Sequence, residues 1–141
     1  MVFDRRGHLF VACDLTSSVI ELDAWGVVQR RYEMARGREF AISSLLATSD
    51  GSVWVARHEP DGLHRVDPAD GTVVTYPLAS GSEPSALVES RGSLYCTNAG
   101  LSTIVQIDRQ GSLVEPLSVL PRDSEPIALT TDSRGRLYAA H

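Results

Sequence analysis

The sequence alternates between short apolar runs and clusters of aspartate, serine and glycine. Residues 9–12 (Leu-Phe-Val-Ala) and 53–56 (Val-Trp-Val-Ala) are apolar at consecutive positions, which indicates strands covered on both faces. The clusters between such runs are typical of tight hairpin turns. No segment carries the apolar stripe, with a period of about 3.6 residues, that marks an amphipathic helix. The pattern therefore predicts an all-β chain of short antiparallel strands.

Three landmarks repeat in step along the chain. The first is a turn glycine before an apolar run, and consecutive examples are 44, 41 and 43 residues apart: Gly7, Gly51, Gly92 and Gly135. The second is a strand that ends in aspartate, with a glycine soon after: Asp23, Asp67 and Asp108, followed by Gly26, Gly71 and Gly111. The third is a Glu-Pro pair at 83–84 and 125–126. One shared period indicates a repeated supersecondary unit.

A period of roughly 40–45 residues is typical of the four-stranded blades of a β-propeller. We predict antiparallel blades at residues 2–43, 44–86 and 87–128 and an incomplete blade at 129–141, about three and a third blades in all. In each blade, strand A is innermost and begins near Ala86 or Ala128. Strand B follows the turn glycine, strand C ends at the aspartate, and strand D includes residues 73–78. Pro77 suits an outer edge strand, which can do without one N–H donor.

Both ends of the repeat pattern fall inside a blade. Val2 aligns with Leu87 near the end of a strand A, and His141 ends a strand B. Closed propellers usually have roughly four to eight blades, and an open arc leaves apolar blade faces exposed. We therefore expect a piece of a six- or seven-bladed propeller. The alternative is that copies of the chain associate through the exposed blade edges to close a ring.

Two stretches carry a family resemblance. Residues 92–108 resemble the NHL repeat, and residues 71–78 with Pro84 resemble the blades of virginiamycin B lyase-like proteins. The blades of the gluconolactonase family are also similar. The resemblance implies a β-propeller and leaves the activity open, because these are residues of the scaffold.

The relatives suggest two classes of function. Many NHL proteins bind partners without catalysis, which implies a ligand-binding or protein-interaction scaffold, our leading expectation. The alternative is a metal-dependent lactone lyase or lactone hydrolase with its site at the central channel, since the lyase uses magnesium and a histidine base and the gluconolactonases use a divalent metal. We match no residue of this sequence to the catalytic histidine and glutamate of the lyase, so whether the chain is an enzyme stays open.

The residue six places after each turn glycine ends strand B and is not apolar in any of the four repeats. These residues are Cys13, Arg57, Asn98 and His141. They are candidates for the mouth of a site that binds a polar small molecule. The plainer interpretation is that strand ends are polar because they meet water.

In a propeller the B–C and D–A loops lie on one face, and here they vary more between repeats than the A–B and C–D turns, so we expect a site on that face near the propeller axis. Acidic residues occur in these loops. Glu83 and Glu125 occupy equivalent loops before strand A, and converging carboxylates there are candidate ligands for Mg²⁺ or Ca²⁺. Glu39 has a related place in the first repeat. The alternative is that these carboxylates accept backbone N–H groups within their own loops. His58, beside Glu59 and Asp61, is a candidate base or ligand, or simply part of a solvated loop.

Other polar residues have structural interpretations. Asp23, Asp67 and Asp108 lie where strands enter turns and are expected to bind turn N–H groups. Cys96 and His64 occupy positions that are apolar in the other repeats and are expected to pack in the core. His8 follows a turn and is expected at the surface.

The composition and net charge of the chain indicate which classes of partner to expect. The 141 residues carry a net charge of −5 and a pI near 5.3, which gives no electrostatic basis for nucleic-acid binding. No apolar run is long enough for a transmembrane helix. The start of the sequence lacks the pattern of a signal peptide, and two cysteines without metal-ligand spacing favour a reducing, cytoplasmic compartment. The expected partner is a small polar molecule or a protein.

Overall fold

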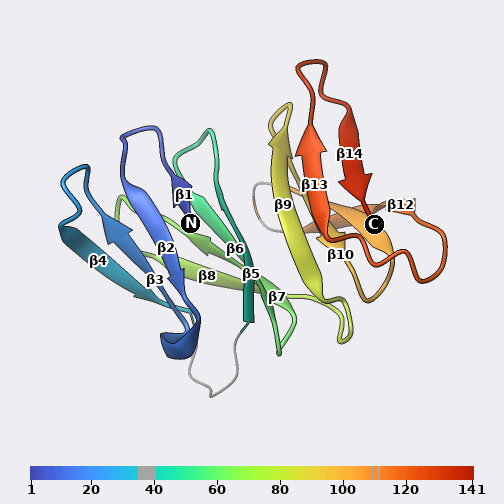
Figure 1. Ribbon diagram of the computed structural model, residues 1–141, viewed down its shortest axis with the longest axis horizontal. Coiled ribbons are helices and arrows are strands. Elements are labelled where there is room, and N and C mark those ends of the chain that lie inside the picture. The colour runs from blue at the N-terminus through green and yellow to red at the C-terminus, as the bar shows by residue number, and fades with distance from the viewer. Residues whose placement is uncertain (35–40, 109, 111) are drawn as a thin grey trace.

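The computed structural model describes residues 1–34, 41–108, 110 and 112–141, and the side chains of residues 113–115 are not among those described. Three four-stranded antiparallel sheets and one two-stranded sheet follow one another along the chain, each with its strands in sequence order (Figure 1). We call them blades 1 to 4. The all-β propeller fold predicted from the repeat is confirmed.

The strand bounds are as follows. Blade 1 contains β1 (Val2–Phe3), β2 (Leu9–Cys13), β3 (Ser18–Leu22) and β4 (Val28–Glu33); blade 2 contains β5 (Ala41–Ala47), β6 (Val53–His58), β7 (Gly62–Val66) and β8 (Val73–Pro77). Blade 3 contains β9 (Pro84–Ser90), β10 (Ser93–Asn98), β11 (Thr103–Ile107) and β12 (Leu113–Val119), and blade 4 contains β13 (Ala128–Thr131) and β14 (Leu137–Ala140). In the described part of the chain, the one helical element is a short 3-10 turn at Asp14–Thr16, and no helix there is long and apolar enough to span a membrane.

The turns form as the repeat predicts. All four turn glycines have a positive φ, between 75° and 89°, which glycine adopts without the steric cost of a side chain. The aspartates that end strand C accept turn N–H groups: Asp23 accepts from Trp25 and Val27 at 2.9 Å, and Asp108 accepts from Ser112 at 2.8 Å. Asp67 accepts from Ala69 at 3.0 Å. Gly111 lies outside the described residues.

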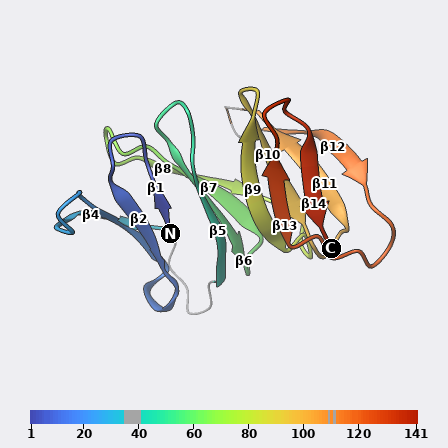
Figure 2. The same ribbon diagram turned by 45° about the horizontal axis from the view of Figure 1, so that its top comes forward.

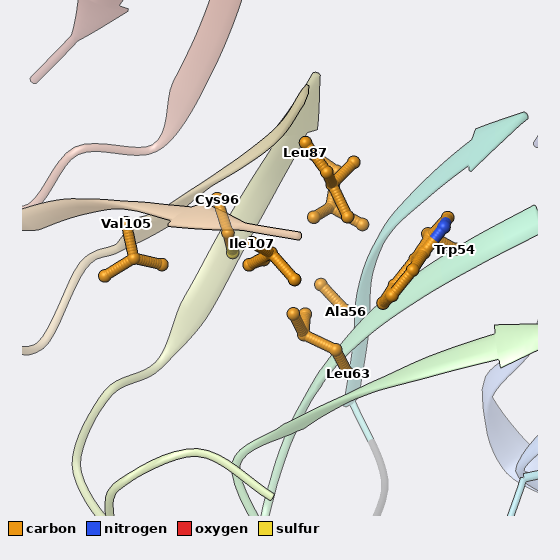
Figure 3. Packing of buried hydrophobic residues seen from close by; sticks show 8 residues of the cluster. Trp54, Ala56, Leu63, Leu87, Cys96, Val105 and Ile107 are labelled. Carbon is orange, nitrogen blue, oxygen red and sulfur yellow. The ribbon is translucent and has the colours of Figure 1, made fainter. Parts of the chain in front are cut away.

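The core lies between the blades. Phe10, Val19 and Tyr32 of blade 1 pack on the side of β6 that carries Val53 and Val55. Trp54, Ala56 and Leu63, on the opposite side of blade 2, pack against Leu87, Cys96 and Ile107 of blade 3 (Figure 3). Strand β6 is thus apolar on both faces because a neighbouring blade covers each face, as its continuous apolar run predicted.

Three buried or half-buried polar groups complete this picture. Cys96 packs as a small apolar residue, as predicted, and burial raises the pKa of its thiol to about 12. His64 is also buried as predicted; its Nδ1 lies 2.9 Å from Thr75 Oγ1, and burial together with the charge of Arg57 lowers its pKa to about 4. The prediction that His8 is exposed is wrong. Its Nδ1 lies 2.7 Å from the buried carboxylate of Glu21, which the pairing of β2 with β3 brings beside the turn.

The blades form an arc, with blade 1 at one end and blade 4 at the other (Figures 1 and 2). The first strand of each blade contacts the preceding blade: β5 contacts β1 and β2, β9 contacts β5 and β6, and β13 contacts β9 and β10. The outer strand β8 ends at Pro77, in the edge position predicted for that proline.

Candidate functional site

The loop between strands B and C of each complete blade is tied to the loop that leaves strand D of the same blade. The N–H of Leu78 donates to the carbonyl of Asp61 at 3.0 Å, and the N–H of Leu120 donates to the carbonyl of Ser102 at 2.9 Å. Met34 and Ser17 are joined in the same way at 3.0 Å. These bonds hold both kinds of loop on one side of the arc, where the sequence predicted a site.

In blade 2 this connection is strengthened by the side chain of Asp61. Its Oδ2 accepts the N–H of Ser82 at 2.9 Å, and its Oδ1 accepts the N–H of Glu83 at 3.2 Å. The equivalent residue of blade 3 is Ser102, whose hydroxyl accepts the N–H of Ser124 at 3.2 Å. Asp61 therefore fixes the backbone immediately before β9, and with it the position of Glu83.

Blade 3 supports the same loop from the other side. The N–H of Gly100 donates to the carbonyl of Ser82 at 3.2 Å, and the N–H of Ala99 donates to the carbonyl of Glu83 at 3.0 Å. A Cβ atom at Gly100 would lie 2.2 Å from the carbonyl oxygen of Gly81 and 3.2 Å from Cδ of Glu83. Only glycine allows this close approach between the two loops.

A cavity of about 420 Å³ lies between the β6–β7 loop and the β8–β9 loop, which are neighbours at the lower edge of the view in Figure 1. Its ionisable lining consists of three carboxylates and an imidazole: Glu59, Asp61, Glu83 and His58. Pro77 and Leu78 contribute an apolar part of the wall, and Ser80 a hydroxyl. A cavity of this volume is large enough for a small organic molecule, and the carboxylates of its lining have the charge that attracts a cation.

The structure brings two of the predicted residues together and places the others elsewhere. His58 and Glu83 both line the cavity. Glu125 is exposed in the loop before β13, and His141 is exposed after β14; neither lines the cavity. Glu39 lies outside the described residues.

The ends of strand B differ from one blade to the next. Arg57 and Asn98 are only 5% and 4% exposed, so the interpretation that these strand ends face water is wrong for both residues. Arg57 lies on the same side of β6 as Val53 and Val55, toward blade 1, and burial lowers the pKa of its guanidinium. Cys13 is half-buried. These residues lie at the ends of strands in the sequence, but neighbouring blades bury them in the folded chain.

The described residues contain no group of three or more histidine, cysteine, aspartate and glutamate side chains placed to hold a metal ion. Glu83 and Glu125 do occupy equivalent loops, and both have a positive φ, of 48° and 43°. Their role as a pair of metal ligands stays a prediction.

Sequence reasoning missed two features. One is the role of Asp61 in fixing the β8–β9 loop. The sequence indicates it only by an aspartate at a position where the other repeats have serine, Ser17 and Ser102. The other is the buried carboxylate of Glu21, which accepts from Arg6 Nη2 at 3.1 Å and from the Tyr32 hydroxyl at 2.5 Å, in addition to its contact with His8. The sequence feature that could have revealed this carboxylate is an acidic residue within the otherwise apolar strand 19–22.

No protein-family model matches the sequence, and no curated protein matches it. Among solved structures, the chain is similar to a streptogramin B lyase, with a TM-score of 0.88 and 20% identity over 99% of this chain and 46% of that chain. It is also similar to virginiamycin B lyase from Staphylococcus aureus, with a TM-score of 0.87 and 15% identity over 99% of this chain and 47% of that chain. The chain has the β-propeller fold.

The propeller fold is shared with proteins of other kinds. The chain is similar to an auxiliary nutrient binding protein from Bacteroides ovatus, with a TM-score of 0.69 and 14% identity over 99% of this chain and 35% of that chain. Identities this low establish the fold alone. The chain spans about half the length of the lyase structures that it matches, which agrees with the prediction of a partial propeller.

Proposed function

We propose that this chain is a ligand-binding propeller module and that its ligand occupies the cavity between the β6–β7 and β8–β9 loops. The observation that carries the proposal is the cavity itself, about 420 Å³ in volume and lined by His58, Glu59, Asp61 and Glu83. Its position on the side of the B–C and D–A loops agrees with the repeat pattern, in which those loops vary most.

The charge of the lining supports a cationic ligand. Three carboxylates face a small volume, and no arginine or lysine is among the described residues that line it. A cation there is attracted by charges of one sign, and water moderates the attraction because Glu59 and Glu83 are exposed. We infer that an ammonium or guanidinium group of the ligand lies between Glu59 and Glu83.

The residues that line the cavity have different roles. Both oxygens of Asp61 already accept backbone N–H groups, so Asp61 acts as a positioning residue. Glu59 and Glu83 are exposed at the cavity and are the contacts for the cation. His58 supplies an imidazole that hydrogen-bonds a polar part of the ligand.

The binding test uses isothermal titration calorimetry with agmatine, Mg²⁺ and Ca²⁺ as separate probes. We expect agmatine to bind and Glu83→Gln to weaken its binding by about tenfold, the equivalent of roughly 1.4 kcal/mol. Glu125→Gln is the matched control, because Glu125 occupies the equivalent loop position with a similar φ but does not line the cavity. Equal losses in the two variants, or no loss in Glu83→Gln, would contradict the proposed site. Binding of Mg²⁺ or Ca²⁺ that needs both glutamates would favour the metal pair instead.

A second candidate is a metal-dependent lactone lyase or lactone hydrolase. The observation in its favour is the structural likeness to two lyases, together with an imidazole and carboxylates in one cavity. A catalytically inactive virginiamycin B lyase from Staphylococcus aureus, to which the chain is also similar, has been solved with quinupristin. The test incubates the chain with quinupristin and Mg²⁺, with and without a chelator, and follows the product by mass spectrometry. Elimination opens the ring without a change in mass, whereas hydrolysis adds one water. Metal-dependent turnover that is lost in His58→Ala would establish an enzyme, and no turnover would leave the binding function.

A further inference from the structure

A second cavity lies in blade 3, at the position equivalent to the cavity of blade 2. It has a volume of about 320 Å³ and lies between the β10–β11 loop and the β12–β13 loop, on the same side of the arc (Figure 1). The same backbone bond marks both places, since Leu120 donates to Ser102 in blade 3 as Leu78 donates to Asp61 in blade 2. The blade 2 cavity forms with blade 3 packed beside it, so such a cavity persists where the next blade is present.

Two carboxylates of the blade 2 cavity have no counterpart in blade 3. At the positions of Glu59 and Asp61, blade 3 has Gly100 and Ser102. Among the described residues that line the second cavity there is one carboxylate, that of Asp123, against three in the first cavity. The second cavity is therefore not a repeat of the cation site.

The second cavity instead combines an apolar surface with a positive charge. Val119, the last residue of β12, and Leu120 both line it. Val119 is 76% exposed, so an apolar group placed against it removes apolar surface from water. Arg122 belongs to the same lining, and a guanidinium pairs with a carboxylate through two N–H groups. An aliphatic group next to a carboxylate is therefore the chemistry that fits this cavity.

The two cavities meet at a pair of glycines. Gly81 lines the first cavity and Gly100 lines the second. The two loops are in close contact there, because a Cβ atom at Gly100 would meet the carbonyl oxygen of Gly81 and would lie 3.2 Å from Cδ of Glu83. Both glycines and Glu83 are exposed, so the border between the cavities lies at the surface. A ligand group bound at Glu83 is thus adjacent to both cavities.

We propose that one ligand occupies both cavities and that it is a short peptide in which a basic residue is followed by an apolar carboxyl-terminal residue. The cation lies between Glu59 and Glu83, as in the proposed function, on which this inference rests. The apolar side chain packs on Val119 and Leu120, and the terminal carboxylate pairs with Arg122. Adjacent residues of a peptide carry these three groups in this order, so the charges of the two cavities give the bound peptide one direction.

The test uses isothermal titration calorimetry on the whole chain with agmatine, arginylglycine, arginylleucine and arginylleucinamide as separate probes. Agmatine tests the cation site by itself. We expect arginylleucine to bind about tenfold more tightly than arginylglycine, because its leucine side chain buries apolar surface that glycine lacks. Glu83→Gln should weaken the binding of agmatine and of both acidic dipeptides.

Two variants of the second cavity separate its apolar and charged parts. Arg122→Gln should weaken the binding of arginylleucine by about threefold, as expected for an exposed ion pair, and leave arginylleucinamide unchanged. Val119→Ser should weaken arginylleucine by about threefold and leave arginylglycine unchanged. Arg5→Gln is the matched control, since Arg5 is an exposed arginine in the β1–β2 turn, on the other side of the arc. Circular dichroism of each variant confirms that it remains folded.

The outcomes distinguish this inference from the proposed function. Agmatine binding that depends on Glu83, together with equal affinities for arginylglycine and arginylleucine, would overturn the shared ligand and leave the cation site. An equal effect of Arg122→Gln on arginylleucine and its amide would overturn the pairing of Arg122 with the carboxylate. Tight binding of arginylleucine that Glu83→Gln leaves unchanged would place the peptide elsewhere. A chain that binds none of the probes would overturn both proposals.

Discussion

Ser85 donates its hydroxyl to the backbone carbonyl of Pro126, 2.6 Å away and one blade further along the chain. Ser43 makes the same bond to the carbonyl of Pro84. Both serines lie where the pairing of strands A and B shifts register, so their side chains are turned toward the next blade. The equivalent residue of blade 4 is Ile127, which is 69% exposed. A repeated polar bond therefore supplements apolar packing at the inner edge of successive blades.

Removal of this bond should loosen the junction between blades 3 and 4. We expect Ser85→Ala to lower the free energy of unfolding by about 1 kcal/mol, the usual net value of one hydrogen bond. Urea denaturation followed by tryptophan fluorescence measures the change. Ser133→Ala, at an exposed turn position of blade 4, is the control. If both variants unfold at the same urea concentration, the bond contributes nothing to stability.

Acid should weaken the interface between blades 1 and 2 through His64. Its pKa in the folded chain is about 4, below the ordinary value of 6.5, so the unfolded chain binds the proton more readily. The stabilising effect of neutral His64 is complete above pH 6.5 and is lost as the pH falls toward 4. The loss amounts to about 3 kcal/mol at most, at 1.36 kcal/mol for each unit of the pKa difference.

His64→Val tests this pH dependence with a residue that the repeat itself uses, since Val105 holds the equivalent position in blade 3. Denaturation curves of the two proteins at several pH values give the difference in unfolding free energy. We expect the variant to lose stability less steeply than the wild type between pH 6.5 and 4. Parallel curves would show that His64 is not the group responsible.

The carboxylate of Glu21 should stabilise blade 1 strongly, because it is buried and accepts from three side chains. Burial and the hydrogen bond to Glu21 also raise the pKa of Tyr32, so the phenol keeps its proton as a donor. We expect Glu21→Gln to cost about 2–3 kcal/mol, since a neutral amide replaces a charged acceptor. Thermal unfolding measures the shift in Tm. Glu33→Gln, an exposed acid on β4, should change the Tm little, and an equal shift in both variants would argue against a special role for Glu21.

Gly100 should be essential for the shape of the proposed site. In Gly100→Ala, the new methyl group meets the carbonyl oxygen of Gly81, and the β8–β9 loop that carries Glu83 must move. We expect agmatine binding to weaken by about tenfold and the unfolding free energy to fall by about 1–3 kcal/mol, the usual cost of overpacking. Leu101→Ala, at the exposed neighbouring position, is the control. Unchanged agmatine binding in Gly100→Ala would show that the position of the β8–β9 loop does not determine binding at the proposed site.

The sequence predicted features that depend on one repeat at a time. The turn glycines and the aspartates of strand C act within a few residues of themselves, so their roles could be inferred from spacing and turn chemistry. Cys96 and His64 could be assigned to the core because the repeat shows apolar residues in their places.

Features that join distant segments could not be predicted in this way. Asp61 binds backbone groups 21 and 22 residues away, and the bond depends on how the β8–β9 loop returns across blade 2. Arg57 and Asn98 are strand ends in sequence, yet they are buried once the blades are stacked. His8 meets Glu21 only through the register of β2 with β3.

The bonds from Ser43 to Pro84 and from Ser85 to Pro126 both span 41 residues. Blade 3 therefore carries both the acceptor for the blade that precedes it, at Pro84, and the donor for the blade that follows it, at Ser85. A tandem duplication of one such unit in the gene would insert a blade whose connecting bonds are already specified on both sides. Growth of the arc by whole units thus requires no simultaneous compensating mutations in its neighbours.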